Sequence, residues 1–254
     1  MKKRYLIANW KMNLDHKASC ALSRTYAQKV EQTKTLLTIL CPSYSSLRDV
    51  AGVVSKHRHI YVGAQNCFWQ DSGSYTGEES PTFLHALGVR YVLIGHSERR
   101  MHLRETDTTI GCKMNMIIEY SKLIPILCVG ENSAERKSGK TVKVLERQLA
   151  TALNGIITPK PFLIAYEPVW AIGTGNPITV QDCKKVSGWI RTYIQRRFGA
   201  FAAQQMSIVY GGSVDSTNAY SIMTEGGVEG LLVGSASLNA KTLVQLHTIL
   251  RAIP

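Results

Sequence analysis

The sequence predicts an α/β protein built as a closed eight-stranded (β/α)8 barrel, and three observations support this. Eight short apolar runs recur along the 254-residue chain. Each run is apolar throughout, which is typical of parallel strands covered on both faces. Most runs are separated by a stretch long enough for a helix, and eight strand–helix units in this length match the size of such a barrel. A doubly wound open sheet stays an alternative, because counting strands does not show that they close.

The predicted strands are the residues 5–10, 36–41, 60–65, 91–96, 123–129, 162–167, 207–212 and 230–235. Between them, residues 141–153 have the pattern of a helix, and another helix begins after Thr179, which with Asp182 resembles an N-terminal capping pair. The chain contains no linker, low-complexity tract or block of like charge. We therefore expect one domain over residues 1–254.

The composition excludes several classes of protein. An apolar content of 44% and a charged content of 19% are typical of an ordinary soluble globular protein. No run approaches the roughly 18 to 20 uncharged apolar residues that span a bilayer. The apolar stretch at residues 5–10 is too short for a signal-peptide core, so a cytoplasmic location is expected. The six cysteines are widely spaced, which predicts small buried hydrophobic residues and neither a zinc site nor a disulfide framework.

The net charge of +12 is the one unusual total, and it is compatible with nucleic-acid binding, attraction of an anionic substrate or a generally basic proteome. The pairs Lys184-Lys185 and Arg196-Arg197 lie within a helical pattern and are predicted to form its solvated face. Neither zinc-finger spacing nor an aromatic RNA-binding signature is present. We therefore expect no nucleic-acid partner and no membrane partner.

Polar residues and glycines appear where many of the predicted strands end. In β/α barrels the active site gathers at the C-terminal ends of the strands. The pattern therefore favours both the barrel and an active site at that end. The residues concerned are Asn9, Lys11, Gln65, Asn66, His96, Glu131, Glu167, Gly211, Gly212, Gly234 and Ser235.

Three of these side chains could carry proton-transfer chemistry. Glu167 ends an apolar run, and desolvation strengthens a carboxylate as a base for abstracting a proton next to a carbonyl. His96 precedes a predicted helix beginning near Ser97, whose dipole would keep the imidazole neutral. Lys11 would stabilise negative charge on a substrate. The structural alternatives are a Glu167–arginine pair, a purely structural histidine and an ordinary surface lysine. Glu98 could be a further acid or a buried ion-pair partner.

Three clusters of small residues predict an anion-binding cradle of backbone N–H groups. They are Gly173 with Gly175, the turn Gly211-Gly212-Ser213, and Gly234-Ser235 opening the last helix. A phosphate site after strands seven and eight recurs in β/α barrels. The sequence has no metal-ligand spacing, Walker lysine, serine-centred elbow or complete dinucleotide fingerprint, so neither a metal nor a cofactor is expected.

Together these segments resemble the triosephosphate isomerase family, in the right order and across nearly the whole chain. The resemblance implies a single-domain TIM barrel. It also implies interconversion of dihydroxyacetone phosphate and D-glyceraldehyde 3-phosphate through an enediolate, without a cofactor, in glycolysis and gluconeogenesis. The matching segments are ANWKMN (8–13), GAQN (63–66), IGHSERR (94–100), CVGE (128–131), AYEPVWAIGTG (165–175), YGGSV (210–214) and GLLVGSASL (230–238).

The resemblance also implies roles for individual residues. Glu167 would be the base and His96 the neutral electrophile, with Glu98 in a supporting role. Asn9 and Lys11 would contact the substrate. The phosphate would be held by the backbone of Gly173, Ser213, Gly234 and Ser235.

Two further loops have implied roles. Residues 168–175 would close over the site as a lid that excludes water. Residues 68–78 resemble the family's projecting third loop, which implies a homodimer. In that dimer Thr76 would reach the neighbouring subunit's site near Lys11.

Two other functions are compatible with parts of the pattern. One is a phosphate-binding β/α barrel that acts on a larger sugar phosphate, which the short lid disfavours. The other is a basic nucleic-acid-binding protein that has lost catalysis, which the presence of Lys11, His96 and Glu167 disfavours.

The chain departs from the family pattern at two positions. The last phosphate loop usually contains Gly-Gly, and here it is Gly234-Ser235. The serine N–H can still donate if its backbone angles do not require glycine, and its hydroxyl could add a donor. The C-terminal hinge of the lid is commonly Lys-Thr-Ala, and here it is Asn176-Pro177-Ile178. Proline fixes its own φ angle and restricts the residue before it.

We predict that Pro177 alters the opening or closing rate of the lid and leaves the chemical step largely intact. Pro177→Thr should therefore change the exchange rates measured by NMR relaxation dispersion, because the hinge regains backbone freedom. Exchange rates equal to those of the wild type would refute this role for the hinge.

Overall fold

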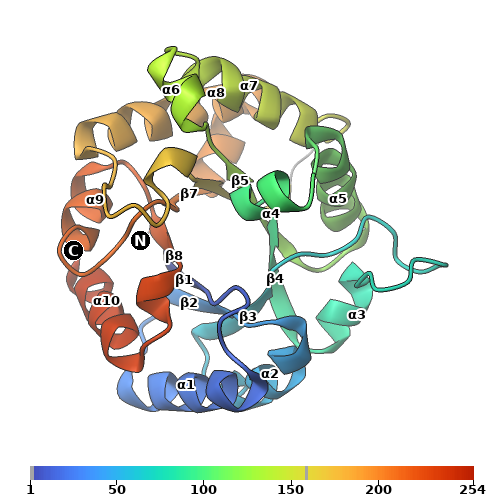
Figure 1. The fold of residues 1–254 in the computed structure, drawn as a ribbon, viewed down its shortest axis with the longest axis vertical. Coiled ribbons are helices and arrows are strands. Elements are labelled where there is room, and N and C mark those ends of the chain that lie inside the picture. Colours follow the sequence, from blue (N-terminus) through green and yellow to red (C-terminus); the bar gives the residue numbers. More distant parts are fainter. Residues whose placement is uncertain (1–2, 158–159) are drawn as a thin grey trace.

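The computed structural model describes residues 3–157 and 160–254 and shows a closed barrel of eight parallel strands in chain order (Figure 1). β1 pairs with both β2 and β8, so the sheet closes on itself and the open-sheet alternative is excluded. The strands are β1 (Arg4–Asn9), β2 (Leu36–Cys41), β3 (Ile60–Ala64), β4 (Val89–Ile94), β5 (Ile124–Val129), β6 (Leu163–Tyr166), β7 (Ser207–Tyr210) and β8 (Gly230–Val233).

All eight predicted strands are confirmed, and their ends differ from the prediction by two residues or fewer. The predicted runs 207–212 and 230–235 extend past β7 and β8, because they include small residues that follow the last paired positions. The segments just beyond the ladders therefore form turns at the C-terminal end of the barrel.

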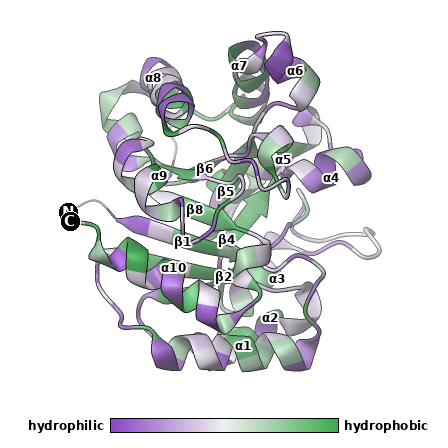
Figure 2. Ribbon diagram, turned by 60° about the vertical axis from the view of Figure 1, so that its left-hand side comes forward, coloured by the Kyte–Doolittle hydropathy of each residue, from purple (hydrophilic) through white to green (hydrophobic). Residues whose placement is uncertain are grey.

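Helices surround the barrel (Figure 1). Figure 2 shows that the strands inside this ring are mostly hydrophobic, whereas the helices carry both hydrophobic and hydrophilic residues. The α-helices are α1 (His16–Lys29), α2 (Leu47–Val54), α3 (Pro81–Ala86), α4 (Ser97–His102), α5 (Asp107–Tyr120), α6 (Ser133–Lys137), α7 (Thr141–Ala152), α8 (Val180–Gln205), α9 (Ala219–Glu225) and α10 (Ala240–Ala252). Three 3₁₀ turns are η1 (Tyr44–Ser46), η2 (Val169–Ala171) and η3 (Ser235–Ser237).

The predicted helix features are largely confirmed. The predicted helix at 141–153 is α7, and α8 begins after Thr179, whose hydroxyl accepts from the Asp182 N–H at 3.1 Å. The pairs Lys184-Lys185 and Arg196-Arg197 are exposed along α8, as predicted. Gly199 interrupts this helix with φ = 87°, a left-handed conformation that glycine adopts without steric cost.

Two apolar layers stabilise the barrel, one on each side of the strands. Side chains such as Ile7, Ile39 and Val209 fill the interior, whereas Leu6 and Leu40, one residue away along their strands, pack under the helices. Full burial of an aliphatic side chain contributes about 1.5–3 kcal/mol relative to exposure. Burial on both sides explains why the strand segments are apolar throughout.

Cys112 is the exception to the predicted burial of the cysteines. The other five are buried, whereas Cys112 is exposed on α5, because it lies on the side of the helix that faces away from the barrel. All six are free thiols. Within the described part of the chain, no helix combines the length and the hydrophobicity needed to cross a bilayer.

A buried hydrogen-bond network ties α10 to α1 and β2. The Tyr26 hydroxyl lies 2.7 Å from both Thr38 Oγ1 and His247 Nδ1. His247 Nε2 lies 3.0 Å from the Glu31 carbonyl oxygen, which can only accept, so Nε2 carries a proton. Burial lowers the pKa of His247, and Arg251 lowers it further, against the opposing effects of the Glu31 carbonyl and carboxylate.

We predict that this histidine makes the fold less stable as the pH falls below about 6.5. The unfolded chain binds a proton at the ordinary histidine pKa of about 6.5, whereas the folded chain does so only at lower pH, so acid favours the unfolded state. Urea unfolding between about pH 7.5 and 5.5 should show this loss, at most about 1.4 kcal/mol per pH unit. His247→Gln, which cannot ionise, should lack that component. Identical pH dependence in the two proteins would contradict the prediction.

Candidate active site

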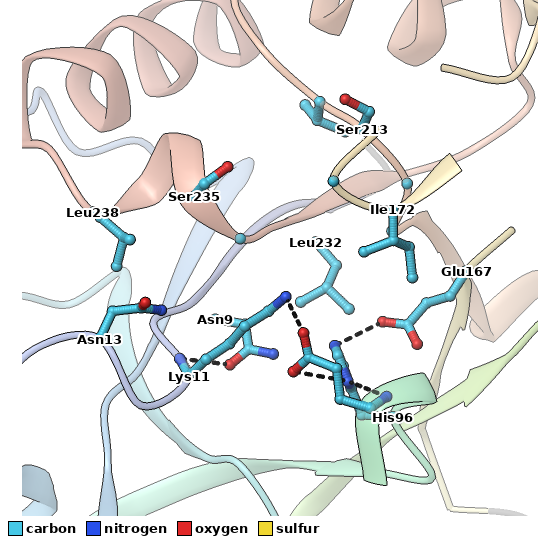
Figure 3. A pocket seen from close by; sticks show the side chains of 16 residues that line it. Asn9, Lys11, Asn13, His96, Glu167, Ile172, Ser213, Leu232, Ser235 and Leu238 are labelled. Carbon is cyan, nitrogen blue, oxygen red and sulfur yellow. Dashed lines mark hydrogen bonds and ion pairs between the residues drawn. The ribbon is translucent and has the colours of Figure 1, made fainter. Parts of the chain in front are cut away.

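A cavity of about 350 Å³ opens at the C-terminal end of the barrel (Figure 3). It is lined by residues that follow β1, β4, β6, β7 and β8, so side chains far apart in sequence converge there. Of the residues with an implied role, all line it except Thr76. The strand-end residues Gln65, Asn66 and Glu131 and the cradle residue Gly175, which the sequence also placed at this end, do not line it. The lining residues are Asn9, Lys11, Asn13, His96, Glu98, Glu167, Ile172, Gly173, Gly211, Gly212, Ser213, Val214, Leu232, Gly234, Ser235 and Leu238.

Glu167 is held at the base of this cavity by the sheet itself. Its N–H donates to the Val129 carbonyl at 2.8 Å, which continues the β5–β6 pairing one residue beyond β6. The residue is 2% exposed, and its Oε2 accepts from the Ser97 N–H at 3.1 Å. Among the described residues, the Glu167 carboxylate lies within ion-pair distance of His96 and of no arginine. The alternative of a structural Glu167–arginine pair is therefore excluded.

Two glycines leave the space that Glu167 occupies. A Cβ atom at Gly130 would lie 1.7 Å from the Glu167 carbonyl oxygen. A Cβ at Gly211 would lie 2.9 Å from Glu167 Cγ. Any larger residue at either position would displace the carboxylate or its backbone, so these glycines set where Glu167 can lie.

The hydrogen bonds of His96 define a neutral imidazole. Nδ1 accepts from the Glu98 N–H at 3.2 Å, so it carries no proton. Nε2 must then carry the hydrogen, and it lies 3.2 Å from Glu167 Oε1 (Figure 3). Glu98 Oε2 is 3.7 Å from Nδ1, but an unprotonated nitrogen forms no charged pair with it. The geometry therefore agrees with the predicted neutral electrophile.

Lys11 has a constrained backbone and a partnered ammonium group. Its φ is 52°, in the left-handed region. Its N–H donates to Asn9 Oδ1 at 3.2 Å, and its carbonyl accepts from Gln65 Nε2 at 2.8 Å. The Nζ atom lies 2.5 Å from Glu98 Oε1. The Glu98 side chain is 39% exposed, so the expectation of a buried ion-pair partner is corrected to a partly exposed one at the cavity rim.

Small residues form the opposite wall of the cavity. Gly173, Ser213, Gly234 and Ser235 all line it, as predicted. A Cβ at Gly234 would lie 3.6 Å from Lys11 Nζ, so the ammonium group borders this wall. Ser235 begins the short turn η3, and the last helix α10 starts only at Ala240, which corrects the expectation that Gly234-Ser235 opens that helix.

The predicted lid, residues 168–175, is anchored at its N-terminal side. Buried Glu131 accepts from Trp170 Nε1 at 3.0 Å and from the Tyr166 hydroxyl at 3.2 Å. The Val169 N–H donates to the Glu131 carbonyl at 3.0 Å, and the Arg136 guanidinium lies 5.2 Å from the centroid of the Trp170 ring.

The C-terminal side of the lid is anchored by different contacts. The Ile178 N–H donates to the Tyr210 hydroxyl at 3.3 Å, and the Asn176 N–H donates to Thr174 Oγ1 at 3.2 Å. Gly173 and Gly175 between the anchors are exposed and have φ angles of 70° and 73°. The lid is thus fixed at both ends with a glycine-rich middle.

Sequence reasoning missed the apolar part of the cavity. Ile172, Val214, Leu232 and Leu238 line it, together with the polar Asn13. Nothing in the sequence separated these apolar residues from the core. The available signal was that all five residues lie within the segments that carry the family resemblance.

Thr76 lies outside the cavity, in an exposed segment between β3 and α3. Figure 1 shows this segment projecting away from the barrel. The predicted contact of Thr76 is with a second copy of this chain and stays a prediction. Within residues 3–157 and 160–254, no group of three or more His, Cys, Asp or Glu side chains could hold a metal ion.

Comparison with known proteins agrees with this geometry. The family model described as triosephosphate isomerase matches residues 4–250. The triosephosphate isomerase of Alkaliphilus metalliredigens is 40% identical over 242 residues, covering 94% of this chain and 96% of the relative. That of Dehalococcoides mccartyi strain CBDB1 is 39% identical over 246 residues, covering 97% and 96%. That of Clostridium botulinum strain Okra is 41% identical over 243 residues, covering 95% and 97%.

The strand order, the converging strand-end residues and the matched length all lead to one assignment: the chain belongs to the triosephosphate isomerase family.

Proposed function

We propose that the cavity at the C-terminal end of the barrel interconverts dihydroxyacetone phosphate and D-glyceraldehyde 3-phosphate, with Glu167 as the base. The observation that carries this proposal is the 3.2 Å contact between buried Glu167 Oε1 and the protonated Nε2 of a neutral His96. It places a carboxylate base and a hydrogen-bond donor on one small cavity. Isomerisation of a hydroxy carbonyl compound requires a base at the carbon next to the carbonyl and a hydrogen-bond donor at the carbonyl oxygen.

The proton transfers balance without a co-reactant. The Glu167 carboxylate takes a proton from the carbon next to the carbonyl, and the C–H electron pair forms the C=C bond of an enediolate. The negative charge moves to the former carbonyl oxygen, to which His96 Nε2 donates. His96 Nε2 passes its proton to that oxygen and takes the proton of the neighbouring hydroxyl group. Glu167 returns a proton to the former carbonyl carbon, so the carbonyl and hydroxyl positions are exchanged.

Asn9 and Lys11 support this charge movement. Both line the cavity beside His96, and the Lys11 ammonium group supplies a fixed positive charge. The Glu98 carboxylate lies 2.5 Å from the Lys11 ammonium group and holds it in place. The backbone N–H of Glu98 donates to His96 Nδ1 and so sets the tautomer of that ring. Preorganised donors of this kind stabilise developing charge more than water does, because they need no reorganisation.

The wall of small residues is proposed to hold the substrate's phosphate. Backbone N–H groups of Gly173, Ser213, Gly234 and Ser235 would donate to its oxygens, and Lys11 borders the same wall. Movement of residues 168–175 would bring Gly173 onto the phosphate and exclude water. A cavity of about 350 Å³ suits a small substrate better than a large sugar phosphate.

We further infer that the protein is a homodimer in the cytoplasm. The exposed segment carrying Thr76 projects from the barrel, as a dimer contact would require (Figure 1). In the dimer, Thr76 would approach Lys11 of the other subunit. The reaction belongs to glycolysis and gluconeogenesis, which supports a cytoplasmic location.

The role of Glu167 is tested by Glu167→Asp, which keeps the carboxylate and withdraws it by one methylene. We expect kcat to fall about 100-fold with a small change in KM, because a shift of about 1 Å misplaces the base. The measurement is steady-state turnover of D-glyceraldehyde 3-phosphate by the purified protein. Glu146→Asp, on the exposed side of α7, is the matched control and should keep the wild-type rate. Equally slow turnover by the wild type and Glu167→Asp would reject the proposed function.

The dimer is tested by sedimentation. The wild type should have about twice the mass of the 28.2 kDa chain, and Thr76→Arg should shift it toward the single-chain mass with reduced activity. The reason is that a bulky cation at the contact would repel the partner's Lys11. Thr192→Arg on exposed α8 is the control. A fully active single-chain wild type would contradict the proposal.

A further inference from the structure

The end of the barrel opposite the cavity carries an excess of unpaired positive charge. The segments that lead into β2, β3, β5 and β6, and the start of β4 itself, each contain at least one exposed lysine or arginine. None of these cations forms an ion pair with another described residue. They are Lys29, Lys34, Lys56, Arg58, Arg90, Lys122 and Lys160, and we call them the basic ring.

Acidic residues are scarce at this end. Glu31 is paired with Arg251 at 2.5 Å and Glu229 with Arg191 at 2.7 Å, which leaves Glu119 and Glu225 beside the basic ring. Most of the 18 acidic residues lie at the cavity end, after the strands or in the first turns of the helices that follow. They include Asp15, Asp49, Asp71, Glu78, Glu79, Glu98, Glu105, Asp107, Glu131, Glu135, Glu167, Asp182 and Asp215. The net charge is therefore unevenly distributed between the two ends.

Large apolar side chains are exposed at the same end as the basic ring, and two of them are exposed by more than three quarters. Ile157, which follows α7, is 89% exposed, and Phe201, near the end of α8, is 76% exposed. Both border a groove of about 460 Å³ that is lined mainly by apolar residues, including Phe162 and Phe198, with Lys160 among the residues lining it. An exposed aromatic and an exposed aliphatic side chain beside lysine are the combination used by proteins that bind at a membrane interface.

We propose that this end of the barrel docks reversibly on an anionic lipid surface. The turns entering the strands of a closed barrel are arranged around one end, so a plane can contact many of them together. A rod-shaped nucleic acid would contact only those along one line. Phe201 and Ile157 would enter the headgroup region while the basic ring lies against anionic lipids.

This orientation leaves the catalytic cavity open to solvent, because the cavity is at the opposite end. The proposal needs no membrane-spanning helix and does not depend on the proposed function. It revises the sequence-based expectation that no membrane is a partner.

The proposal is tested by sedimentation of the full-length protein with lipid vesicles. At low ionic strength the wild type should bind equimolar phosphatidylcholine–phosphatidylserine vesicles and not pure phosphatidylcholine vesicles. The triple variant Lys34→Gln, Lys56→Gln, Arg58→Gln should lower the partition coefficient by about 100-fold, given the usual contribution of each basic residue near an anionic surface. Turnover should be unchanged, which shows that the variant is folded.

A matched triple variant distinguishes the contribution of the basic ring to vesicle binding from that of the net charge. Lys17→Gln, Lys140→Gln, Lys241→Gln removes the same charge from exposed positions at the cavity end that form no ion pair with described residues. It should retain most of the binding. Equal loss in both triple variants would overturn the proposal, since net charge alone would then explain the binding.

The apolar contribution is tested by Phe201→Ser. This variant should lose the part of the vesicle binding that persists at about 0.15 M salt, where surface charge is screened. Absence of wild-type binding to the anionic vesicles at low ionic strength would overturn the proposal. So would preferential binding to a single-stranded or duplex RNA, which would assign the basic ring to nucleic acid.

Discussion

The contact between the Glu167 carboxylate and the His96 imidazole depends on the register of three successive barrel strands, and the rest of the site is arranged around it. β4 and β6 are not neighbours; β5 lies between them and fixes their relative register. Because the strands are parallel and end at the same side, residues following β4 and β6 face one cavity. Glycines at 130 and 211 then keep the space that the carboxylate needs. A change in strand register or a side chain at either glycine would separate the proposed base from the proposed donor.

The site combines fixed donors with the proposed lid, residues 168–175. The backbone N–H groups of Ser97 and Glu98 donate to the Glu167 carboxylate and the His96 imidazole, so the proposed base and the proposed donor are held in place without substrate. Glu131 and Tyr210 anchor the two ends of the lid from the barrel side. The glycine-rich middle of the lid can therefore change conformation without disturbing the base. One set of hydrogen bonds therefore positions the carboxylate and the imidazole, and a different set anchors the proposed lid.

Most of the fold and of the polar site could be predicted from the sequence, for physical reasons. Strands buried on both sides are apolar throughout, and a polar residue at the end of such a run, such as Glu167 or His96, is conspicuous. The apolar cavity residues Ile172 and Leu232 could not be distinguished from core residues, because their chemistry is the same. The exposure of Cys112 and Glu98 depends on which way each side chain faces after packing. The uneven distribution of charge between the two barrel ends could not be predicted either. The net charge of +12 does not say where the charges lie, and their placement follows from the topology.

The central claim is that Glu167 removes a proton from carbon, and isomerisation in D₂O tests it most directly. A proton held by a carboxylate exchanges with solvent, so proton NMR of the product should show deuterium at the carbon that receives the returned proton. Glu167→Gln, which retains the shape and cannot act as the base, should abolish both turnover and deuterium incorporation. A product free of deuterium, as a direct hydride shift would give, would contradict the account. Undiminished deuterium incorporation by Glu167→Gln would contradict it equally.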